Sequence, residues 1–426
     1  MTDLHNARFV GANRVGRRAV IRASAAIGLA QLASPFILRS ARGDTPLRIG
    51  MIDPLTGAYA APARNEVMGA QLAVSRLNAA GGVLGRPIEL LVEDSANDVG
   101  TGVQKARKLV ERDHVDFLIG DVNSAVAQAI AQVAMENKIL HIVSGGHTDT
   151  ITGKDCKWNV YRVCNTTRME SNAVADILFK KYGKKWHFIT PDYTFGHTLQ
   201  AALEVNLKRL GGIETGAELT PLGTTDFSAY LIKARAANPD VIILLVQGQD
   251  MVNCLKQIVQ FGINKEVPIA GTQQELESLE GLPSEARIGT WMFEWYWNQP
   301  GVAHLPEFIA DIRKVNKGRV PTARHWFGFT SVMTMGLVAA QEKTTDAVKL
   351  ARALGDFELP PEVKLQPNKV YYRAGDHQLM LSAFIGQARG EGKDDPDDLF
   401  KVDRVVPGDE IAPPVGETGC NLTWPS

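Results

Sequence analysis

The sequence is poor in the residues and patterns that mark several classes of protein. Four cysteines in 426 residues are too few for a disulfide-dense scaffold, and none of them forms a CxxC pair. No HExxH motif or Cys/His cluster suggests zinc, so the sequence predicts no metal site. Lysine and arginine number 46 against 47 aspartates and glutamates, which leaves no basic surplus to attract nucleic acid.

The even charge balance conceals a basic N-terminal segment. Residues 1–43 hold seven arginines and one acid, so they carry +6, and the net charge of −1 leaves −7 for the rest. Arg17 and Arg18 precede a weakly apolar stretch at 23–38, which is shorter than the roughly 20 residues that span a membrane. The segment resembles a twin-arginine export signal, with a membrane anchor or an amphipathic helix as alternatives. We therefore expect a periplasmic protein that is released by cleavage before Asp44.

From residue 47 onward, short apolar runs alternate with stretches of helical periodicity. This alternation predicts right-handed βαβ crossovers and mostly parallel sheets. This alternation of strands and helices begins twice along the chain, so we expect two α/β lobes, the second starting near Asn165. The predicted strands lie at 47–53, 87–94, 115–120, 139–144, 185–190, 213–219, 241–246 and 267–270.

The glycine-rich run 78–87 is unlike a phosphate-binding loop in its position. Its glycines end a predicted helix and precede a strand, whereas a phosphate loop leaves a strand and opens a helix. We interpret them as a helix C-cap. Ser144 and His147 do not form a G-x-S-x-G nucleophile motif either. The sequence therefore predicts no cofactor and no enzyme.

Polar residues follow two predicted strands of the first lobe, at the edge where open α/β sheets bind ligands. Ser124 opens a helix, where its hydroxyl lies beside free backbone N–H groups; the alternative is an ordinary N-cap. Gly145 and Gly146 follow the next strand and expose the backbone to close approach. His147 adds a donor for an anion.

Equivalent positions in the second lobe carry aromatic and amide side chains. Tyr193 and Phe195 follow the strand 185–190, where they form either a cleft wall or a hydrophobic plug. Gln247 and Gln273 follow the strands 241–246 and 267–270. Their amides suit hydrogen bonding to the polar atoms of a ligand without supplying charge.

Two further features leave alternatives open. Bulky aromatic residues recur at every second position over 291–297, namely Trp291, Phe293, Trp295 and Trp297, which predicts a strand with one bulky face. That face forms either an aromatic wall for a flat ligand or the packing at a lobe junction. Cys156 and Cys164 bracket a short segment and are a possible disulfide, whereas pairing of Cys254 with Cys420 would depend on the fold.

The order and spacing of these segments resemble the leucine/isoleucine/valine-binding family, the extracytoplasmic solute receptors of ABC importers. The resemblance covers 47 to about 387. It rests on the segments 47–57, 78–87, 93–94, 117–124, 192–196 and 372–378.

The resemblance implies the type I periplasmic-binding-protein fold, with two Rossmann-like lobes joined by a three-strand hinge. The first lobe would comprise 44–164 and about 293–366, the second 165–290 and about 369–400, and the C-terminal tail 401–426. The three crossover strands would lie near 163–165, 289–293 and 365–369.

The resemblance also implies roles for the candidate residues in a cleft between the lobes. Ser124 matches the carboxylate-binding serine of the family, and Gly145 and Gly146 match its main-chain contacts. The remaining candidates by position are His147, Tyr193, Phe195, Gln247, Tyr59 and Gln273.

One departure from the family concerns the ligand. Relatives that bind α-amino acids usually hold the ammonium group with an acid after the strand placed at 267–270. Here residues 271–274 read Gly-Thr-Gln-Gln, and Glu275 would have to reach further. An unpaired ammonium in a dry cleft costs several kcal/mol. Amino acids, amides, urea-like solutes and aromatic carboxylates therefore all stay open, with His147 and the tryptophans favouring a flat or anionic ligand.

The function implied is that of a receptor rather than a catalyst. A small solute would close the hinge, and the closed form would deliver it to a membrane permease driven by an ATPase. The alternative is a ligand sensor of the same fold that controls a regulator instead of transport.

Overall fold

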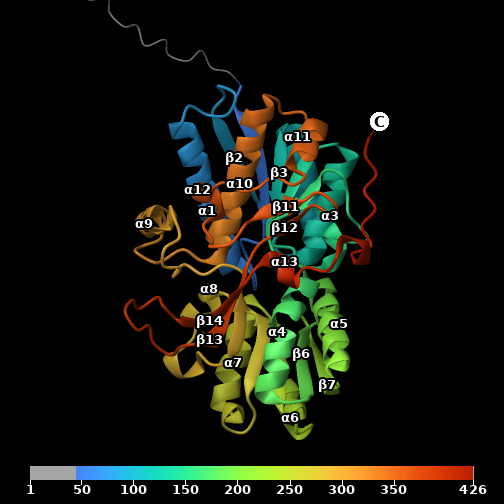
Figure 1. Cartoon of the computed structure of the whole chain (residues 1–426), viewed down its shortest axis with the longest axis vertical. Coiled ribbons are helices and arrows are strands. Elements are labelled where there is room, and N and C mark those ends of the chain that lie inside the picture. Colours follow the sequence, from blue (N-terminus) through green and yellow to red (C-terminus); the bar gives the residue numbers. More distant parts are fainter. Residues whose placement is uncertain (1–44, 426) are drawn as a thin grey trace, which may run out of the picture. The chain divides into compact units, whose positions relative to one another are not determined.

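The computed structural model describes residues 45–425, so the export signal predicted at 1–43 lies outside the described residues. The described chain folds into two seven-stranded sheets with helices against their faces (Figure 1). We call each sheet with its packed helices a lobe. None of the described helices combines the length and the apolar character that crossing a bilayer requires.

The first lobe is built on the strand order β11-β12-β5-β4-β3-β1-β2. Neighbouring strands are parallel except β11, which is antiparallel to β12. The strands are β1 (Leu47–Asp53), β2 (Ile88–Asp94), β3 (Phe117–Gly120), β4 (Leu140–Val143), β5 (Val160–Arg162), β11 (Tyr371–Arg373) and β12 (Gln378–Met380). The helices are α1 (Ala60–Ala79), α2 (Val99–Arg107), α3 (Ser124–Glu136), α10 (Ala323–Glu342) and α11 (Ala347–Leu354).

The second lobe has the strand order β14-β13-β10-β9-β8-β6-β7, in which β13 and β14 run antiparallel to their neighbours. Its strands are β6 (Lys185–Pro191), β7 (Ile213–Thr220), β8 (Val241–Leu244), β9 (Ile269–Gln273), β10 (Thr290–Phe293), β13 (Ala383–Ala388) and β14 (Phe400–Val406). Its helices are α4 (Thr167–Tyr182), α5 (Thr194–Arg209), α6 (Ser228–Ala236), α7 (Gly248–Gln260) and α8 (Leu276–Glu280). The remaining α-helices are α9 (Leu305–Val315), α12 (Pro361–Lys364) and α13 (Gly408–Ile411).

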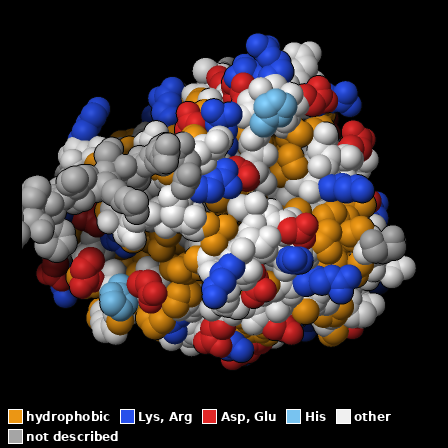
Figure 2. All heavy atoms as spheres, turned by 90° about the horizontal axis from the view of Figure 1, so that it is seen from above, with side chains coloured by type: hydrophobic (Ala, Val, Ile, Leu, Met, Phe, Trp, Pro, Cys, Tyr) orange, Lys and Arg blue, Asp and Glu red, His pale blue; other side chains and the backbone are white. Residues whose placement is uncertain are grey.

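The local sequence explains why these elements form. Every residue of β3, β4 and β8 is buried, as expected for parallel strands with helices on both faces. Helices alternate with these strands as the periodicity predicts, so the α/β fold class is confirmed. On the face seen in Figure 2, acidic and basic side chains are interspersed, in keeping with the nearly even charge balance.

The chain passes between the sheets after β5, after β10 and between β12 and β13. The last passage lies at 381–382 and not at 365–369, because Gln378 of β12 pairs with Arg162 of β5 in the first sheet. Residues 400–406, expected mostly in the tail, instead form β14 beside β13. Both differences come from strand pairings between distant segments, which local periodicity does not reveal.

The disulfide predicted between Cys156 and Cys164 is wrong. Cys156 is bonded to Cys420, at a Cα–Cα distance of 5.5 Å, and Cys164 and Cys254 are free and buried. The extended strand β5 carries the chain away from Cys156, so that Cys164 lies in the core while Cys156 stays in a loop. The fold brings the C-terminal segment to that loop.

Candidate ligand-binding site

A small cavity lies between the two lobes, at the carboxyl ends of their strands. It measures about 10 Å³, roughly the space of one water molecule. Seven of the nine candidate residues line it, and the sequence reasoning missed the other two lining residues, Val122 and Arg324. The complete lining is Tyr59, Val122, Ser124, His147, Tyr193, Phe195, Gln247, Gln273 and Arg324.

Ser124 is the first residue of α3, but it is not the cap. Asn123 is the N-cap, and its side-chain oxygen accepts hydrogen bonds from the backbone N–H groups of Ala125 and Val126. The Ser124 hydroxyl oxygen instead accepts from the backbone N–H of Thr148 at 3.2 Å. A hydroxyl that accepts here still has its own hydrogen to donate toward the cavity.

Gly145 and Gly146 lie beside the cavity without lining it. A Cβ atom on Gly145 would come within 2.4 Å of the Arg324 guanidinium, and one on Gly146 within 2.8 Å of Ala127. The two glycines therefore make room for side chains that pack behind the site. Their role as main-chain ligand contacts stays a prediction.

His147 is held by a buried acid from the other side of the cavity. Its Nε2 lies 2.7 Å from a carboxylate oxygen of Glu294, in the crossover that follows β10. Glu294 also accepts hydrogen bonds from the Gln273 amide at 2.9 Å and from the backbone N–H of Asn165. Nothing in the sequence pattern of 291–297 indicated a role for Glu294.

Arg324 provides a second charged group at the cavity. It lies in the first turn of α10, and its guanidinium is 2.5 Å from Glu275 of the second lobe and 3.5 Å from Glu66 of α1. Burial lowers the pKa of Arg324, but the carboxylates of Glu275 and Glu66 outweigh it and raise that pKa above its ordinary value. The arginine is therefore charged at any working pH.

The carboxyl groups around Arg324 are almost fully buried. Glu275 is only 2% exposed, and its Oε2 has no hydrogen-bond partner among the described residues. Burial raises the pKa of Glu66 to about 7, although the charge of Arg324 opposes the shift. Glu275, two residues beyond the end of β9, thus reaches Arg324. A role in holding an ammonium group stays a prediction.

Contacts between the lobes close the edge of the cavity. The hydroxyls of Tyr59 and Tyr193 are 2.7 Å apart, and burial, with the neighbouring Tyr193, raises the pKa of Tyr59. Beside them, the backbone N–H of Gln249 donates to the carbonyl of Ala58 at 3.0 Å. These bonds join the loop before α1 to the starts of α5 and α7.

The tryptophans pack at the lobe junction. The strand predicted at 291–297 ends at Phe293, and none of Trp291, Trp295 and Trp297 lines the cavity. The indole of Trp295 donates to the carbonyl of Leu365 at 2.9 Å. The aromatic-wall alternative is therefore not supported, and the packing alternative describes these side chains.

The chemistry of the site is that of binding. Arg324 and His147 line the cavity and can approach an anionic group, and hydroxyls and amides lie beside them. Glu275 and Glu294 do not line the cavity but are bonded to Arg324 and His147. Ser124 accepts from a backbone N–H group and His147 is bonded to Glu294, so the pair does not form a nucleophile and base.

Comparisons with known sequences point to one family. A family model described as periplasmic binding protein matches residues 46–394. The Leu/Ile/Val-binding protein homolog 1 of Brucella melitensis is 27% identical over 319 residues, which are 74% of this chain and 83% of the relative. Homolog 2 of Brucella abortus is 28% identical over 312 residues, 72% of this chain and 82% of that protein.

Solved structures agree in fold. A periplasmic binding protein from Burkholderia mallei has a TM-score of 0.82 at 27% identity, over 88% of this chain and 98% of that one. An amino acid ABC transporter substrate-binding protein from Pseudomonas fluorescens has a TM-score of 0.80 at 25% identity. The match covers 89% of this chain and 100% of that one. Proteins of this family and fold bind solutes and are not enzymes. The chain belongs to the periplasmic binding proteins of the leucine/isoleucine/valine-binding type.

Proposed function

We propose that the chain is the solute receptor of an ABC importer and captures a zwitterionic, amino-acid-like solute between its lobes. The observation that carries this proposal is a buried pair of opposite charges, in which Arg324 lines the cavity and is bonded to Glu275. A carboxylate and an ammonium on one small molecule match such a pair. The Pseudomonas fluorescens protein, described as an amino acid transporter component, supports the same class.

The buried acids favour a zwitterion over a simple carboxylate. Two structural neighbours were solved with 3,4-dihydroxybenzoic acid and with benzoate, at 21% and 18% identity, and at that level they support the fold alone. A ligand with only a carboxylate would compete with Glu275 for Arg324 and leave that acid buried without a counter-charge. Removing one partner of a buried ion pair costs about 3–5 kcal/mol of stability, because the other charge is left buried and unpaired.

Hinge closure explains how a solute enters so small a cavity. About 10 Å³ cannot hold an amino acid, so the lobes must separate before binding and close around the guest. Ser124, His147 and Arg324 belong to the first lobe and would bind first. Tyr193, Phe195, Gln247 and Gln273 of the second lobe would then complete the enclosure, and the closed form would dock on a permease.

A thermal-shift panel tests the ligand class. We expect one or more amino acids to raise the melting temperature, since a ligand at 100 times its dissociation constant adds about 2.7 kcal/mol to the free energy of unfolding. Each active amino acid is then compared by calorimetry with the same molecule lacking its amino group. The deaminated analogue should bind at least about 100-fold more weakly. Tighter binding of benzoate or of the deaminated acid would overturn the proposal.

A further inference from the structure

The C-terminal segment 407–425, here called the strap, connects the lobes a fourth time. It leaves β14 of the second sheet, and near its end Cys420 forms the disulfide with Cys156 of the first lobe. In Figure 1 this red segment runs from α13, near the lobe junction, up beside the first lobe. It starts directly over a crossover, because a Cβ on Gly408 would lie 2.7 Å from the backbone of Leu381.

Two side chains of α4 attach the strap to the second lobe. The amide of Asn172 donates to the carbonyl of Ile411 at 2.8 Å. Arg168 donates to the carbonyl of Glu417 at 2.7 Å and to its carboxylate at 3.2 Å. Arg168 is exposed in part, so these polar bonds can exchange with water.

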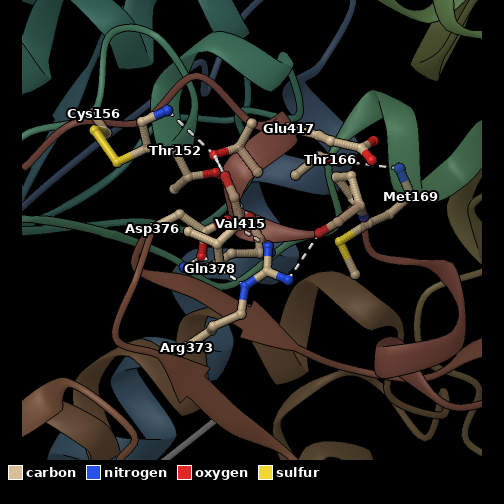
Figure 3. A network of polar contacts seen from close by, with 12 residues as sticks. Thr152, Cys156, Thr166, Met169, Arg373, Asp376, Gln378, Val415 and Glu417 are labelled. Carbon is tan, nitrogen blue, oxygen red and sulfur yellow. Dashed lines mark hydrogen bonds and ion pairs between the residues drawn. A yellow bond between two sulfur atoms is a disulfide. The ribbon is translucent and has the colours of Figure 1, made fainter.

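The first lobe holds the strap through the hairpin of β11 and β12. Arg373 donates to the carbonyl of Pro413 at 2.9 Å, and Asp376 fixes the Arg373 guanidinium at 2.9 Å (Figure 3). The side chain of Val415 packs against Gly375, where an added Cβ would meet it at 2.8 Å. The hydroxyl of Tyr371 donates to Asp409 at 2.7 Å.

The end of the strap is anchored to the first lobe. Cys420 is bonded to Cys156, and beyond it the Trp424 ring lies 6.2 Å from Trp158 and 5.8 Å from His377, between ring centroids. The guanidinium of Arg352 lies 5.0 Å from the Trp424 ring centroid. The disulfide makes the attachment of the strap to the first lobe permanent, whereas its hydrogen bonds to α4 are reversible.

The position of the disulfide in the chain gives the strap a mechanical role. Residues 156 and 420 are 264 positions apart, and all three passages between the sheets lie between them. The bond therefore closes a covalent ring that runs through both lobes. Any rotation that separates the lobes must stretch the strap or release it from α4.

We propose that the disulfide-anchored strap restrains opening of the cleft and so shifts the equilibrium of the free protein toward the closed arrangement. Its anchoring to the first lobe forces the contacts of Asn172 and Arg168 to break when the lobes separate. Without the disulfide, the tail can follow the second lobe and those contacts persist. The strap acts from the hinge region, and among the described residues no hydrogen bond or ion pair joins it to a residue that lines the cavity.

Hydrogen exchange of the ligand-free protein tests this restraint. The probe is the backbone N–H of Gln249, which is bonded to Ala58 across the lobes. We expect the double variant Cys156→Ser/Cys420→Ser to lose protection at 247–251, while peptides of β3 in the first-lobe core keep theirs. Lys154→Ala changes an exposed side chain of the same loop and leaves the disulfide, so its exchange should equal that of the wild type.

Two further measurements keep the test decisive. The unfolded, unreduced protein should contain two free thiols, Cys164 and Cys254, and four would overturn the proposal. Arg168→Ala/Asn172→Ala keeps the disulfide but removes the attachments to α4, so it should also reduce protection at 247–251. If the variants exchange faster only within the strap, and the amides at 247–251 are unchanged, the disulfide only fastens the tail. That result would contradict the proposal. Because no ligand is used, this outcome is independent of the proposed solute.

Discussion

At the scale of residues, the charged groups beside the cavity owe their importance to burial. Arg324 is 3% exposed, Glu275 2% and Glu294 1%, so none of them can exchange its partner for bulk water. In such surroundings an unpaired charge is far more costly than at the surface. A ligand that supplies both signs can insert into these pairs without leaving a charge alone.

Ser124→Ala tests the hydroxyl that the sequence singles out. We expect the variant to bind its solute about 1–3 kcal/mol more weakly, because a buried hydrogen-bond partner of the ligand is left unsatisfied. Isothermal calorimetry with the best amino acid of the panel measures the change. Ser284→Ala, on an exposed turn of the second lobe, should bind like the wild type. Equal affinities of the two variants would refute a role for Ser124.

At the scale of elements, α1 and α10 position the charges of the first lobe. A Cβ on Gly69 of α1 would lie 1.8 Å from the carbonyl oxygen of His325, and one on Gly328 of α10 would lie 1.9 Å from that of Glu66. The two backbones therefore approach each other more closely than any side chain would allow. This contact places Glu66 of α1 beside Arg324 of α10.

Gly328→Ala should separate the two helices. The new methyl group meets backbone atoms that cannot rotate away, so we expect a loss of about 3 kcal/mol or more in the free energy of unfolding, measured by urea denaturation. Gly336→Ala, also in α10, is the matched control. Its Cβ would meet the flexible end of Leu77 at 2.7 Å, and the gain in helix propensity offsets part of the cost. Equal stabilities of the two variants would contradict the close packing of α1 and α10.

At the scale of the whole molecule, Glu277 links pH to the joining of the lobes. It belongs to α8 of the second lobe and accepts hydrogen bonds from Asn65 at 2.8 Å and Thr322 at 2.5 Å, both in the first lobe. Burial, and then the charge of Glu275, raise the pKa of Glu277 from 4.5 to about 7. Between these values the folded protein keeps a proton that the unfolded chain has released.

The stability that depends on Glu277 should therefore fall as pH rises from about 4.5 to about 7, and this contribution should level off above it. Glu277→Gln removes the titrating group, so we expect a smaller fall in the urea midpoint between pH 5 and pH 8. Some of the slope should remain, because burial also raises the pKa of Glu66 to about 7 and of Asp121 to about 8. Glu285→Gln, at the surface, is the control. A Glu277→Gln variant with the full wild-type slope would contradict the assignment.

The sequence by itself determined the two α/β lobes and most of the cavity wall. Val241–Leu244 is a strand because its own side chains are apolar, and Ser124 or Tyr193 follows a strand because the local pattern ends there. Parallel strands bring their carboxyl ends to one edge of a sheet. Residues far apart in the sequence, such as Tyr59 and Gln247, could therefore be expected to meet at one cleft.

Only the tertiary structure decided which distant groups pair. Arg324 meets Glu275, Glu294 meets His147, Cys420 meets Cys156, and β14 joins β13. Hydrophobic periodicity describes which face of an element is buried, but each of these partners is chosen by how whole elements pack. The charges proposed to select the ligand, and the strap proposed to restrain the lobes, depend on that packing.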